Sequence, residues 1–377
     1  MTGASAYGRP SFHFDRSEVQ IGYHFCEHMF SEISALSQYS LGAIRDIKPV
    51  SFGLIHKTWK VESTNGAFIL QKVNPIYGPS VMEDMGAVLT YLKSRGRTVM
   101  EIVRTRSGAS FLQDAPGFWR VFTYISGSVF ESLPSSDAAY EAGKLLGLYH
   151  RLLNDFHYEF KHKRSIKHNI PLLYDAYKKA TAGHADPEVA LLDSFIERMP
   201  ELDLPSHLRK CVHHGDAKIS NFIFQEREKP QAVAMVDFDD CGKNYNILHE
   251  LGGFFRSTSW MNDPHTGASS FSLDYFSRAL AGYAEGSRDF LTDEEWQLIP
   301  QVLELNLLQL TSRFVRDMFE DNYFTWDPAK YPSRRVHNLA RAKEHIALYG
   351  DVTGKRDTLR EIVNQIHGTT DKNFSFS

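Results

Sequence analysis

The first third of the chain carries short runs of alternating apolar and polar residues, whereas the remainder carries longer runs with helical spacing. Alternation with a period of two is typical of strands, and apolar residues three and four positions apart are typical of amphipathic helices. The change comes at the break Ser126-Gly127. We therefore predict an α+β protein with two lobes, an antiparallel sheet lobe over residues 1–125 and a mostly helical lobe over residues 126–377.

The sheet is predicted to contain about five antiparallel strands, accompanied by two helices. Helices are predicted at residues 18–38, before the sheet, and at 80–94, after its third strand. Asn65-Gly66 separates two strand-like runs and predicts a hairpin, because both positions of the favoured turn need positive φ. The strand-like runs cover residues 44–50, 58–62, 67–73, 99–104, 111–113 and 118–125.

The second lobe is predicted to be helical except around one polar stretch, residues 213–221, and a short strand that follows it at 232–236. The Lys- and His-rich segment 157–168 is predicted to be a solvated loop, with lining for an anionic ligand as the alternative. The helices are predicted at residues 140–154, 172–179, 188–198, 248–258, 273–285, 293–323 and 335–349.

Composition narrows the possible partners and compartment. The 377 residues have a formal net charge of -4, so the basic excess typical of nucleic-acid-binding proteins is missing. No run of about 18 apolar residues predicts a membrane span, and the charged first twenty residues do not resemble a secretory signal. The cysteines Cys26, Cys211 and Cys241 are odd in number and far apart. We therefore expect a cytoplasmic protein without nucleic-acid or membrane partners.

The polar stretch and the strand after it carry the residue types of a phosphoryl-transfer centre. Asp216 is followed by Asn221 five positions later, and Asp237 comes directly after the short strand. One carboxylate can take the proton of an attacking hydroxyl, while an amide oxygen and another carboxylate hold magnesium beside the nucleotide phosphates. Asp216 is thus the candidate base, and Asn221 and Asp237 are the candidate Mg²⁺ ligands.

Residues next to these three have predicted supporting roles. Lys218 lies two positions after the candidate base and can offset charge on the transferring phosphoryl group. His214 is expected to brace the loop by hydrogen bonding, and Glu250, at the start of a helix, to anchor it from behind. Asp239 is either a further metal ligand or part of the substrate wall.

The sheet lobe offers candidates for nucleotide binding. Lys72 ends the third strand and Glu83 lies in the first turn of the next helix, a placement that permits the ion pair of a phosphate-binding lysine. Two unrelated surface charges are the alternative. Backbone groups around Tyr124 can pair with adenine, and the loop 51–56, with a single glycine, is a weak candidate for covering the phosphates.

Two possible zinc sites are alternatives to a phosphoryl-transfer centre. Cys211, His213, His214, Asp216 and Cys241 include common zinc ligands, but their spacing fits no closed zinc pattern and leaves Asn221 without a role. His24 and His28 would share a helix face, from which Cys26 would project away. A packed or solvated helix explains that pair more simply.

The segments 214–221 and 236–239 resemble those of the aminoglycoside phosphotransferase and choline kinase superfamily, which has a protein-kinase-like fold. Other segments are similar to its N-acetylhexosamine 1-kinase branch, and the resemblance covers residues 40–350. The segments that carry it are Phe52-Gly53-Leu54-Ile55-His56, Phe68-Ile69-Leu70-Gln71-Lys72-Val73-Asn74, Val81-Met82-Glu83-Asp84-Met85, Asp216-Ala217-Lys218, Arg313-Phe314 and His337-Asn338-Leu339-Ala340-Arg341-Ala342.

The resemblance implies ATP- and Mg²⁺-dependent phosphorylation of a hydroxyl on a small molecule, in the nearest branch a sugar or amino sugar. It assigns the same base and metal ligands, and it assigns Lys72 and Glu83 as the phosphate-binding lysine and its partner. We expect the acceptor near Arg256, Arg313 and Tyr323. Homoserine, choline, another amino alcohol or an aminoglycoside remain alternative acceptors, and a catalytically dead kinase fold used for binding remains an alternative from another class.

Overall fold

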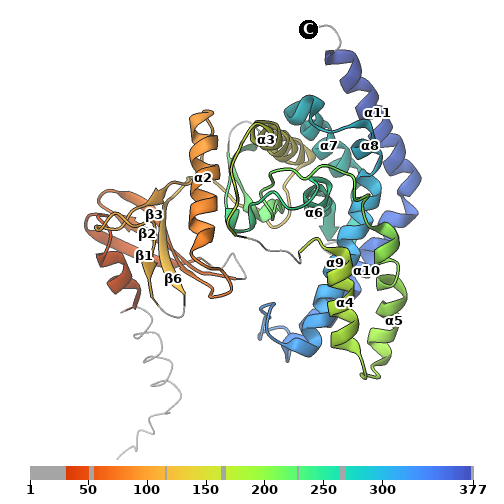
Figure 1. Ribbon diagram of the computed structural model, residues 1–377, viewed down its shortest axis with the longest axis horizontal. Helices are drawn as coiled ribbons and strands as arrows, with labels where there is room; N and C mark the ends of the chain where they lie inside the picture. The colour runs from red at the N-terminus through yellow and green to blue at the C-terminus, as the bar shows by residue number, and fades with distance from the viewer. Residues whose placement is uncertain are drawn as a thin grey trace, which may run out of the picture.

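The computed structural model describes residues 31–50, 55–114, 117–162, 167–226, 229–262 and 269–374. Within these ranges the chain forms a sheet region followed by a helical region, the predicted α+β architecture (Figure 1). Of the helix predicted at 18–38, residues 31–37 are helical and residue 38 is in a turn, whereas residues 18–30, with His24, Cys26 and His28, lie outside the described residues.

The sheet has six strands, all paired antiparallel, in the order β1-β2-β3-β6-β4, with β5 also pairing β6. The predicted hairpin between β2 and β3 forms, but Ser63 pairs with Gly66, so Thr64 and Asn65 make the turn, one residue earlier than expected. The strands are β1 (Ile44–Pro49), β2 (Lys57–Ser63), β3 (Gly66–Val73), β4 (Ile102–Val103), β5 (Leu112–Gln113) and β6 (Phe118–Thr123).

Helix α2 (Ser80–Ser94) lies between the sheet and the helical region (Figure 1). Its apolar positions recur at three- and four-residue spacing, and Val81, Met85 and Val88 are fully buried. They belong to a single apolar core that also contains Phe118 of β6 and residues of the helices beyond it. This shared core fixes the sheet region against the helical region.

Nine helices make up the described part of the helical region. The helix predicted at 293–323 is two, α8 and α9, because Pro300 occupies the first turn of a helix, where its missing N–H costs nothing. The helices are α3 (Ser136–Asn154), α4 (Ile170–Thr181), α5 (Pro187–Ile196), α6 (Leu248–Ser259), α7 (Leu273–Ser287), α8 (Asp293–Gln297), α9 (Ile299–Glu320), α10 (Arg334–Gly354) and α11 (Arg356–Phe374).

A short hairpin in this region brings together the polar stretch, residues 213–221, and the acidic segment, residues 236–239. The strands β7 (Phe222–Gln225) and β8 (Gln231–Met235) pair antiparallel, with Phe222 opposite Met235. The backbone N–H of Val236 donates to the Asn221 carbonyl oxygen at 2.9 Å. The end of the polar stretch therefore meets the start of the acidic segment. A second hairpin joins β9 (Trp260–Asn262) to β10 (Ser269–Phe271).

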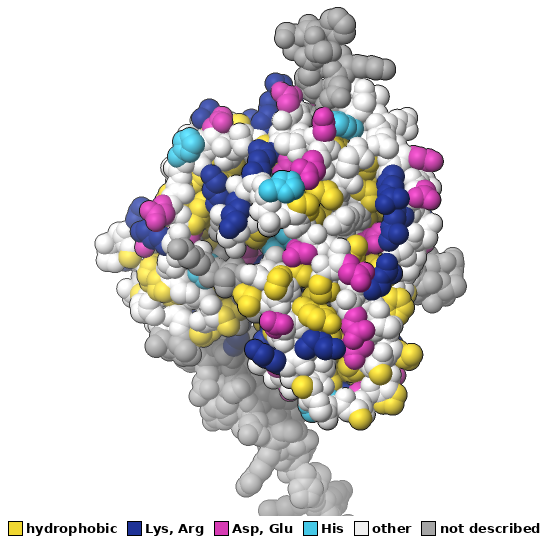
Figure 2. All heavy atoms as spheres, turned by 45° about the vertical axis from the view of Figure 1, so that its right-hand side comes forward, with side chains coloured by type: hydrophobic (Ala, Val, Ile, Leu, Met, Phe, Trp, Pro, Cys, Tyr) yellow, Lys and Arg dark blue, Asp and Glu magenta, His cyan; other side chains and the backbone are white. Residues whose placement is uncertain are grey.

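Acidic and basic side chains lie interspersed on the face of the molecule shown in Figure 2. That face therefore lacks a broad basic surface of the kind that nucleic-acid binding requires. No described helix is both long enough and apolar enough to cross a bilayer.

Candidate active site

Asp216 stands at the centre of the polar stretch, between two lysines. Lys218 Nζ donates to Asp216 Oδ2 at 2.8 Å, and Lys167 Nζ lies 3.5 Å from Asp216 Oδ1. Asn221 Nδ2 donates to the Asp216 carbonyl oxygen at 2.8 Å. The Asp216 side chain keeps 33% of its surface exposed, so the carboxylate is accessible while its position is fixed.

The loop that carries Asp216 is held from behind by Glu250 of α6. The Glu250 carboxylate accepts hydrogen bonds from the backbone N–H groups of His214 and Gly215, at 3.0 and 3.2 Å. Gly215 has a φ of +95°, and a Cβ at this position would lie 2.2 Å from the Asp240 carbonyl oxygen. Only glycine fits both the conformation and the close approach. The predicted anchoring role of Glu250 is confirmed.

His214 braces the same loop through both ring nitrogens. Its Nδ1 accepts from the backbone N–H of Asp216 at 3.2 Å, which leaves Nε2 to donate to the Val236 carbonyl oxygen at 2.9 Å. Burial lowers the pKa of His214. The imidazole is therefore a neutral brace between the two segments, as predicted.

The charges around Asp216 keep it ionised. Burial alone would raise the pKa of Asp216, but the positive charges of Lys167 and Lys218 hold it well below its usual range. The same contact raises the pKa of Lys218. An ionised carboxylate flanked by two ammonium groups can orient a hydroxyl and receive its proton as the oxygen forms a new bond.

Asp237 and Asn221 fit a magnesium ion by their donor chemistry. Asp237 adopts a left-handed conformation with φ 69°. Its burial and the neighbouring Asp239 charge raise the pKa of Asp237 to about 8, against the opposing effect of Lys218. Because the Asn221 amide nitrogen is used in bonds to Asp216, its amide oxygen remains for a cation. Hard oxygen donors of this kind suit Mg²⁺.

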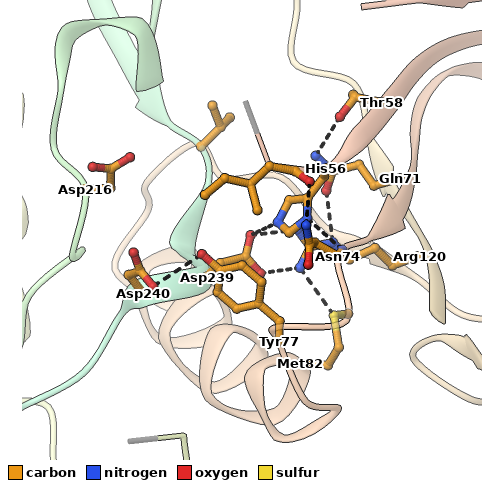
Figure 3. A network of polar contacts seen from close by, with 12 residues as sticks. His56, Thr58, Gln71, Asn74, Tyr77, Met82, Arg120, Asp216, Asp239 and Asp240 are labelled. Atoms are coloured by element: carbon orange, nitrogen blue, oxygen red, sulfur yellow. Dashed lines mark hydrogen bonds and ion pairs between the residues drawn. The ribbon is translucent and has the colours of Figure 1, made fainter. Parts of the chain in front are cut away.

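Asp239, in contrast, already has a buried cation partner from the sheet. Arg120 of β6 is 1% exposed and binds Asp239 through two nitrogens, NH1 to Oδ1 at 2.5 Å and NH2 to Oδ2 at 2.6 Å (Figure 3). Arg120 Nε donates to Gln71 Oε1 of β3 at 2.9 Å. Burial would raise the pKa of Asp239, but the Arg120 charge holds it well below its usual range. The pair is ionised and joins the sheet to the acidic segment, residues 236–239.

His56 completes this network and is a poor metal ligand in it. The oxygen and nitrogen ligand atoms of His56, Asp237 and Asp239 lie within 4.8 Å of one another. However, His56 Nδ1 accepts from the Asn74 backbone N–H at 3.1 Å. Its Nε2 therefore carries the proton and faces Asp239 Oδ2 at 3.3 Å. Neither imidazole nitrogen has a lone pair left for a metal ion.

The predicted ion pair between Lys72 and Glu83 does not form, so this prediction is wrong. Successive residues of a strand point to opposite faces, so Gln71 faces Arg120 while Lys72 points away from it. Lys72 Nζ binds Asp114 Oδ2 at 2.5 Å and lies over the Trp119 ring, and Glu83 pairs with Lys161 at the surface. The cation that reaches the acidic segment from the sheet is Arg120, which sequence reasoning missed.

Tyr124 follows the end of β6. Its backbone N–H donates to the Ala67 carbonyl oxygen at 3.1 Å, and Lys60 Nζ lies 4.7 Å from its ring. The N–H is therefore committed to the sheet, and only the carbonyl oxygen of Tyr124 can serve the predicted pairing with adenine, which stays a prediction.

On the other side of Asp216, helices α6 and α9 present Arg256 and Arg313. The backbone N–H of Ile219 donates to Ser257 Oγ at 3.0 Å, which ties α6 to the polar stretch. Arg256 Nε donates to Asn306 Oδ1 of α9 at 3.0 Å. Burial, opposed by the Asp216 charge and aided by the nearby Arg313 charge, lowers the pKa of Arg256 to about 10. These charges lie close enough to act on one another.

The loop after α9 places aromatic rings beside Arg313. The guanidinium of Arg313 lies 5.2 Å from the Tyr323 ring and 5.5 Å from the Phe324 ring. Asp317 holds this loop, since its carboxylate accepts the backbone N–H groups of residues 322–324 at 2.8 to 3.0 Å. Asn338 Nδ2 donates to Asp317 Oδ2 at 2.9 Å. Arg313 and Tyr323 are thus brought together as predicted, and their role as acceptor contacts stays a prediction.

Lys167 is a second residue that sequence reasoning missed. Its Nζ contacts the Gly215 carbonyl oxygen at 2.5 Å and Asp240 Oδ2 at 2.9 Å, besides Asp216. Although burial would lower the pKa of Lys167, the two carboxylates raise it. It lies in the segment 157–168, which was predicted to be a solvated loop, with lining for an anionic ligand as the alternative. The lysine content was the available signal.

The zinc site expected as an alternative does not form. Within the part of the chain that the structure describes, no metal-ligand group includes Cys211, His213 or Cys241. His213 Nε2 instead bonds Asn244 Oδ1 at 2.7 Å, and its ring stacks on Tyr245.

The site's order along the chain and its fold match a known family. The sequence profile of the phosphotransferase enzyme family matches residues 46–287, well over half of the chain. The chain belongs to this family. The matched residues include Arg120, Asp216, Asn221, Asp237 and Arg256, whereas the contacts from α9, the loop after it and α10 lie outside the match.

A curated relative is a homoserine kinase from Methylobacterium radiotolerans, 23% identical over 189 residues. That alignment covers 50% of this chain and 58% of the relative, so the chain spans less than two thirds of the relative's length. Solved structures with a similar fold include a microcompartment-associated aminopropanol kinase, with a TM-score of 0.61 and 19% identity, covering 86% of this chain and 97% of the other.

Two further similar structures hold nucleotides. A spectinomycin phosphotransferase in complex with ADP and spectinomycin has a TM-score of 0.59 and 12% identity, covering 86% of this chain and 97% of the other. An amicoumacin kinase in complex with AMP-PNP and Ca²⁺ has a TM-score of 0.57 and 14% identity, covering 87% and 95%. At these identities the likeness shows the fold.

Proposed function

We propose that the protein is a cytoplasmic kinase that transfers the γ-phosphoryl group of ATP to a hydroxyl of a small molecule, a sugar or amino sugar. The observation that carries the proposal is an ionised Asp216 with Lys218 2.8 Å away, beside Asn221 and Asp237. Phosphoryl transfer depends mainly on positioning and charge neutralisation, and this arrangement supplies both. The buried, unpaired Cys211 and Cys241 suit a reducing compartment.

Each residue has one role in this proposal. Asp216 orients the acceptor hydroxyl and takes its proton, and Lys218 stabilises charge on the transferring group. Asn221 and Asp237 would hold Mg²⁺, which supplies neutralisation of the nucleotide phosphates. The buried Arg120–Asp239 pair takes the role that the resemblance gave to Lys72 and Glu83. It holds the sheet lobe, residues 1–125, against the acidic segment 236–239 of the helical lobe, residues 126–377.

The acceptor side supports a sugar over a cationic amine. It presents the arginines Arg256 and Arg313, the amide of Asn306, and the rings of Tyr323 and Phe324. Sugars are commonly held by planar donors and aromatic faces, whereas a cationic acceptor needs carboxylates beyond those that serve the nucleotide. An amino alcohol or hydroxy amino acid is the second candidate, because the homoserine kinase is a sequence relative.

The proposal is tested by turnover with a panel of sugars, amino sugars, amino alcohols and aminoglycosides, measured as ADP release. Replacing Asp216→Asn should lower kcat by about 10²- to 10⁴-fold, the usual contribution of a general base. Binding of ATP, measured by calorimetry, should be retained because Asp216 does not hold the nucleotide. The exposed Asp274→Asn is the matched control and should keep wild-type turnover.

Full activity in the Asp216→Asn protein would remove the proposed base. Nucleotide binding by the wild type without turnover of any hydroxyl compound would instead favour the alternative of a catalytically dead kinase fold.

A further inference from the structure

Two arginines beside the catalytic loop lack an acidic partner. Among the described residues, no carboxylate oxygen lies within 4.0 Å of the guanidinium of Arg256 or Arg313. Arg256 has a neutral partner, Asn306, and Arg313 lies over two aromatic rings. Both side chains are only partly exposed. Their positive charges are therefore neither paired within the described protein nor fully solvated.

The helices direct both arginines to the same place. Asn306 and Arg313 are seven positions apart on α9, about two turns, so they share a helix face. The Arg256–Asn306 bond shows that this face is turned toward α6. Ser257, the next residue on α6, bonds Ile219 of the catalytic stretch. Both guanidinium groups therefore lie near the polar stretch, and the charges of Asp216 and Arg313 both act on Arg256.

The other cations of the site are already matched. Lys218 is paired with Asp216 at 2.8 Å, and Lys167 is paired with Asp240 at 2.9 Å. Holding Arg256 and Arg313 close together without counter-ions costs free energy, which a bound anion would recover. Guanidinium groups bind carboxylate and phosphate oxygens with matched two-pronged geometry.

We infer that the acceptor carries an oxyanion, a carboxylate or a phosphate, which Arg256 and Arg313 bind while its hydroxyl faces Asp216. This inference rests on the proposed function, since it names the chemistry of the acceptor. The acceptor oxygen forms the new bond to the γ-phosphorus, and the bond from that phosphorus to the bridging oxygen breaks. ADP leaves, and the hydroxyl proton passes to Asp216.

The test compares hydroxyl compounds that differ only in an oxyanion. Purified protein with ATP and Mg²⁺ is given glucose, glucuronate or glucose 6-phosphate, and separately N-acetylglucosamine or N-acetylglucosamine 6-phosphate. Homoserine and its neutral carboxamide, which keeps the hydroxyl, form a further pair. The charged member of at least one pair should have a kcat/KM about 10- to 100-fold higher, as expected for one or two hydrogen bonds to charged groups. The carboxylate and phosphate arms separate the two sources of charge.

Variants locate the effect. Arg256→Gln and Arg313→Gln should each bring the ratio of kcat/KM between charged and neutral members toward one, mainly through KM for the charged member. Arg313→Lys should retain part of the preference because it keeps the charge. Arg316→Gln is the matched control on the same helix, since Arg316 pairs with Glu320, and it should leave the ratio unchanged. Thermal unfolding of each variant checks that it is folded.

The possible results distinguish failure of the oxyanion inference from failure of the proposed kinase function. Equal or better turnover of the neutral members overturns the inference and leaves the kinase assignment standing. A preference for charged acceptors that survives in both glutamine variants also overturns it. If no hydroxyl compound raises ADP release above background, the proposed function is rejected and the inference with it. The wild-type ratio alone decides the matter if the variants do not fold.

Discussion

The two sides of Asp216 differ in how their charges are balanced. On the side of the sheet, Arg120 and Asp239 are both almost fully buried and neutralise each other, whereas Asp237 has no salt-bridge partner among the described residues. On the acceptor side, Arg256 and Arg313 are unmatched among the described residues. A buried ion pair of this kind fixes the positions of the segments that form the site. In the proposed function, the unmatched groups bind charged ligands, a cation with the nucleotide at Asp237 and an anion at Arg256 and Arg313.

The largest loss of stability is expected when one member of the buried Arg120–Asp239 pair is removed. Arg120→Met leaves the buried Asp239 without its arginine and with His56 as its remaining partner, so the free energy of unfolding should fall by about 3 to 5 kcal/mol. Chemical denaturation measures this loss. The double variant Arg120→Met with Asp239→Leu should regain much of the stability, because two apolar side chains then pack where the ions were.

Activity distinguishes positioning from stability in the same pair of variants. If Arg120 positions the acidic segment, the double variant should remain poorly active, with a raised Mg²⁺ requirement, even though it is stable. Recovery of wild-type kcat and Mg²⁺ dependence in the double variant would show that the ion pair matters for stability alone.

Glu250 tests whether the loop between the two sides depends on a buried carboxylate. Burial opposes its ionisation, yet contact with His150 and other neighbouring histidines holds the pKa of Glu250 at about 2, below the ordinary 4.5. A group with a lowered folded-state pKa stabilises the protein above pH 4.5, and this contribution is lost as pH falls toward 2. It amounts to about 3 kcal/mol.

Urea unfolding of the Glu250→Gln protein should therefore show a weaker fall in stability between pH 4.5 and 2 than the wild type. Glu101→Gln, at an exposed surface ion pair, should leave the pH dependence unchanged. An identical pH dependence in Glu250→Gln and wild type would contradict the role assigned to this carboxylate.

The smallest effect is expected at Lys72, on the other face of the sheet. Its pair with Asp114 is at the surface, where such pairs contribute about 0.2 to 1 kcal/mol, so Lys72→Met should leave stability nearly unchanged. Its KM for ATP should change little, because Lys72 points away from Arg120. A large loss of nucleotide affinity in Lys72→Met, measured by calorimetry, would restore the lysine to the role that the resemblance gave it.

The sequence correctly predicted features formed by residues that are close together along the chain. The alternation of residues 44–73 predicted the first three strands, and the spacing of Asp216, Asn221 and Asp237 predicted which side chains the β7–β8 hairpin brings together. Glu250 and His214 have the bracing roles expected of them.

The wrong predictions involve contacts between distant residues. Arg120 and Asp239 are 119 positions apart, so no spacing rule links them. The signal for Arg120 was an isolated charge in the otherwise apolar run Phe118–Thr123, since a buried arginine needs an acid. Lys72 was chosen for its place at the end of a strand, but the face to which it points follows from the register of β3. Lys167 was hidden within a segment whose composition is typical of solvated loops.

Transfer of a phosphoryl group from ATP to a hydroxyl, with Asp216 as the base, is tested most directly by following the phosphoryl group itself. Phosphorus NMR of wild-type protein with ATP, Mg²⁺ and an accepted hydroxyl compound should show a phosphate-ester resonance that grows in step with ADP, and Asp216→Asn should produce almost none. If ADP accumulates with inorganic phosphate alone, or if Asp216→Asn forms the ester at the wild-type rate, Asp216 is not the base of a hydroxyl kinase.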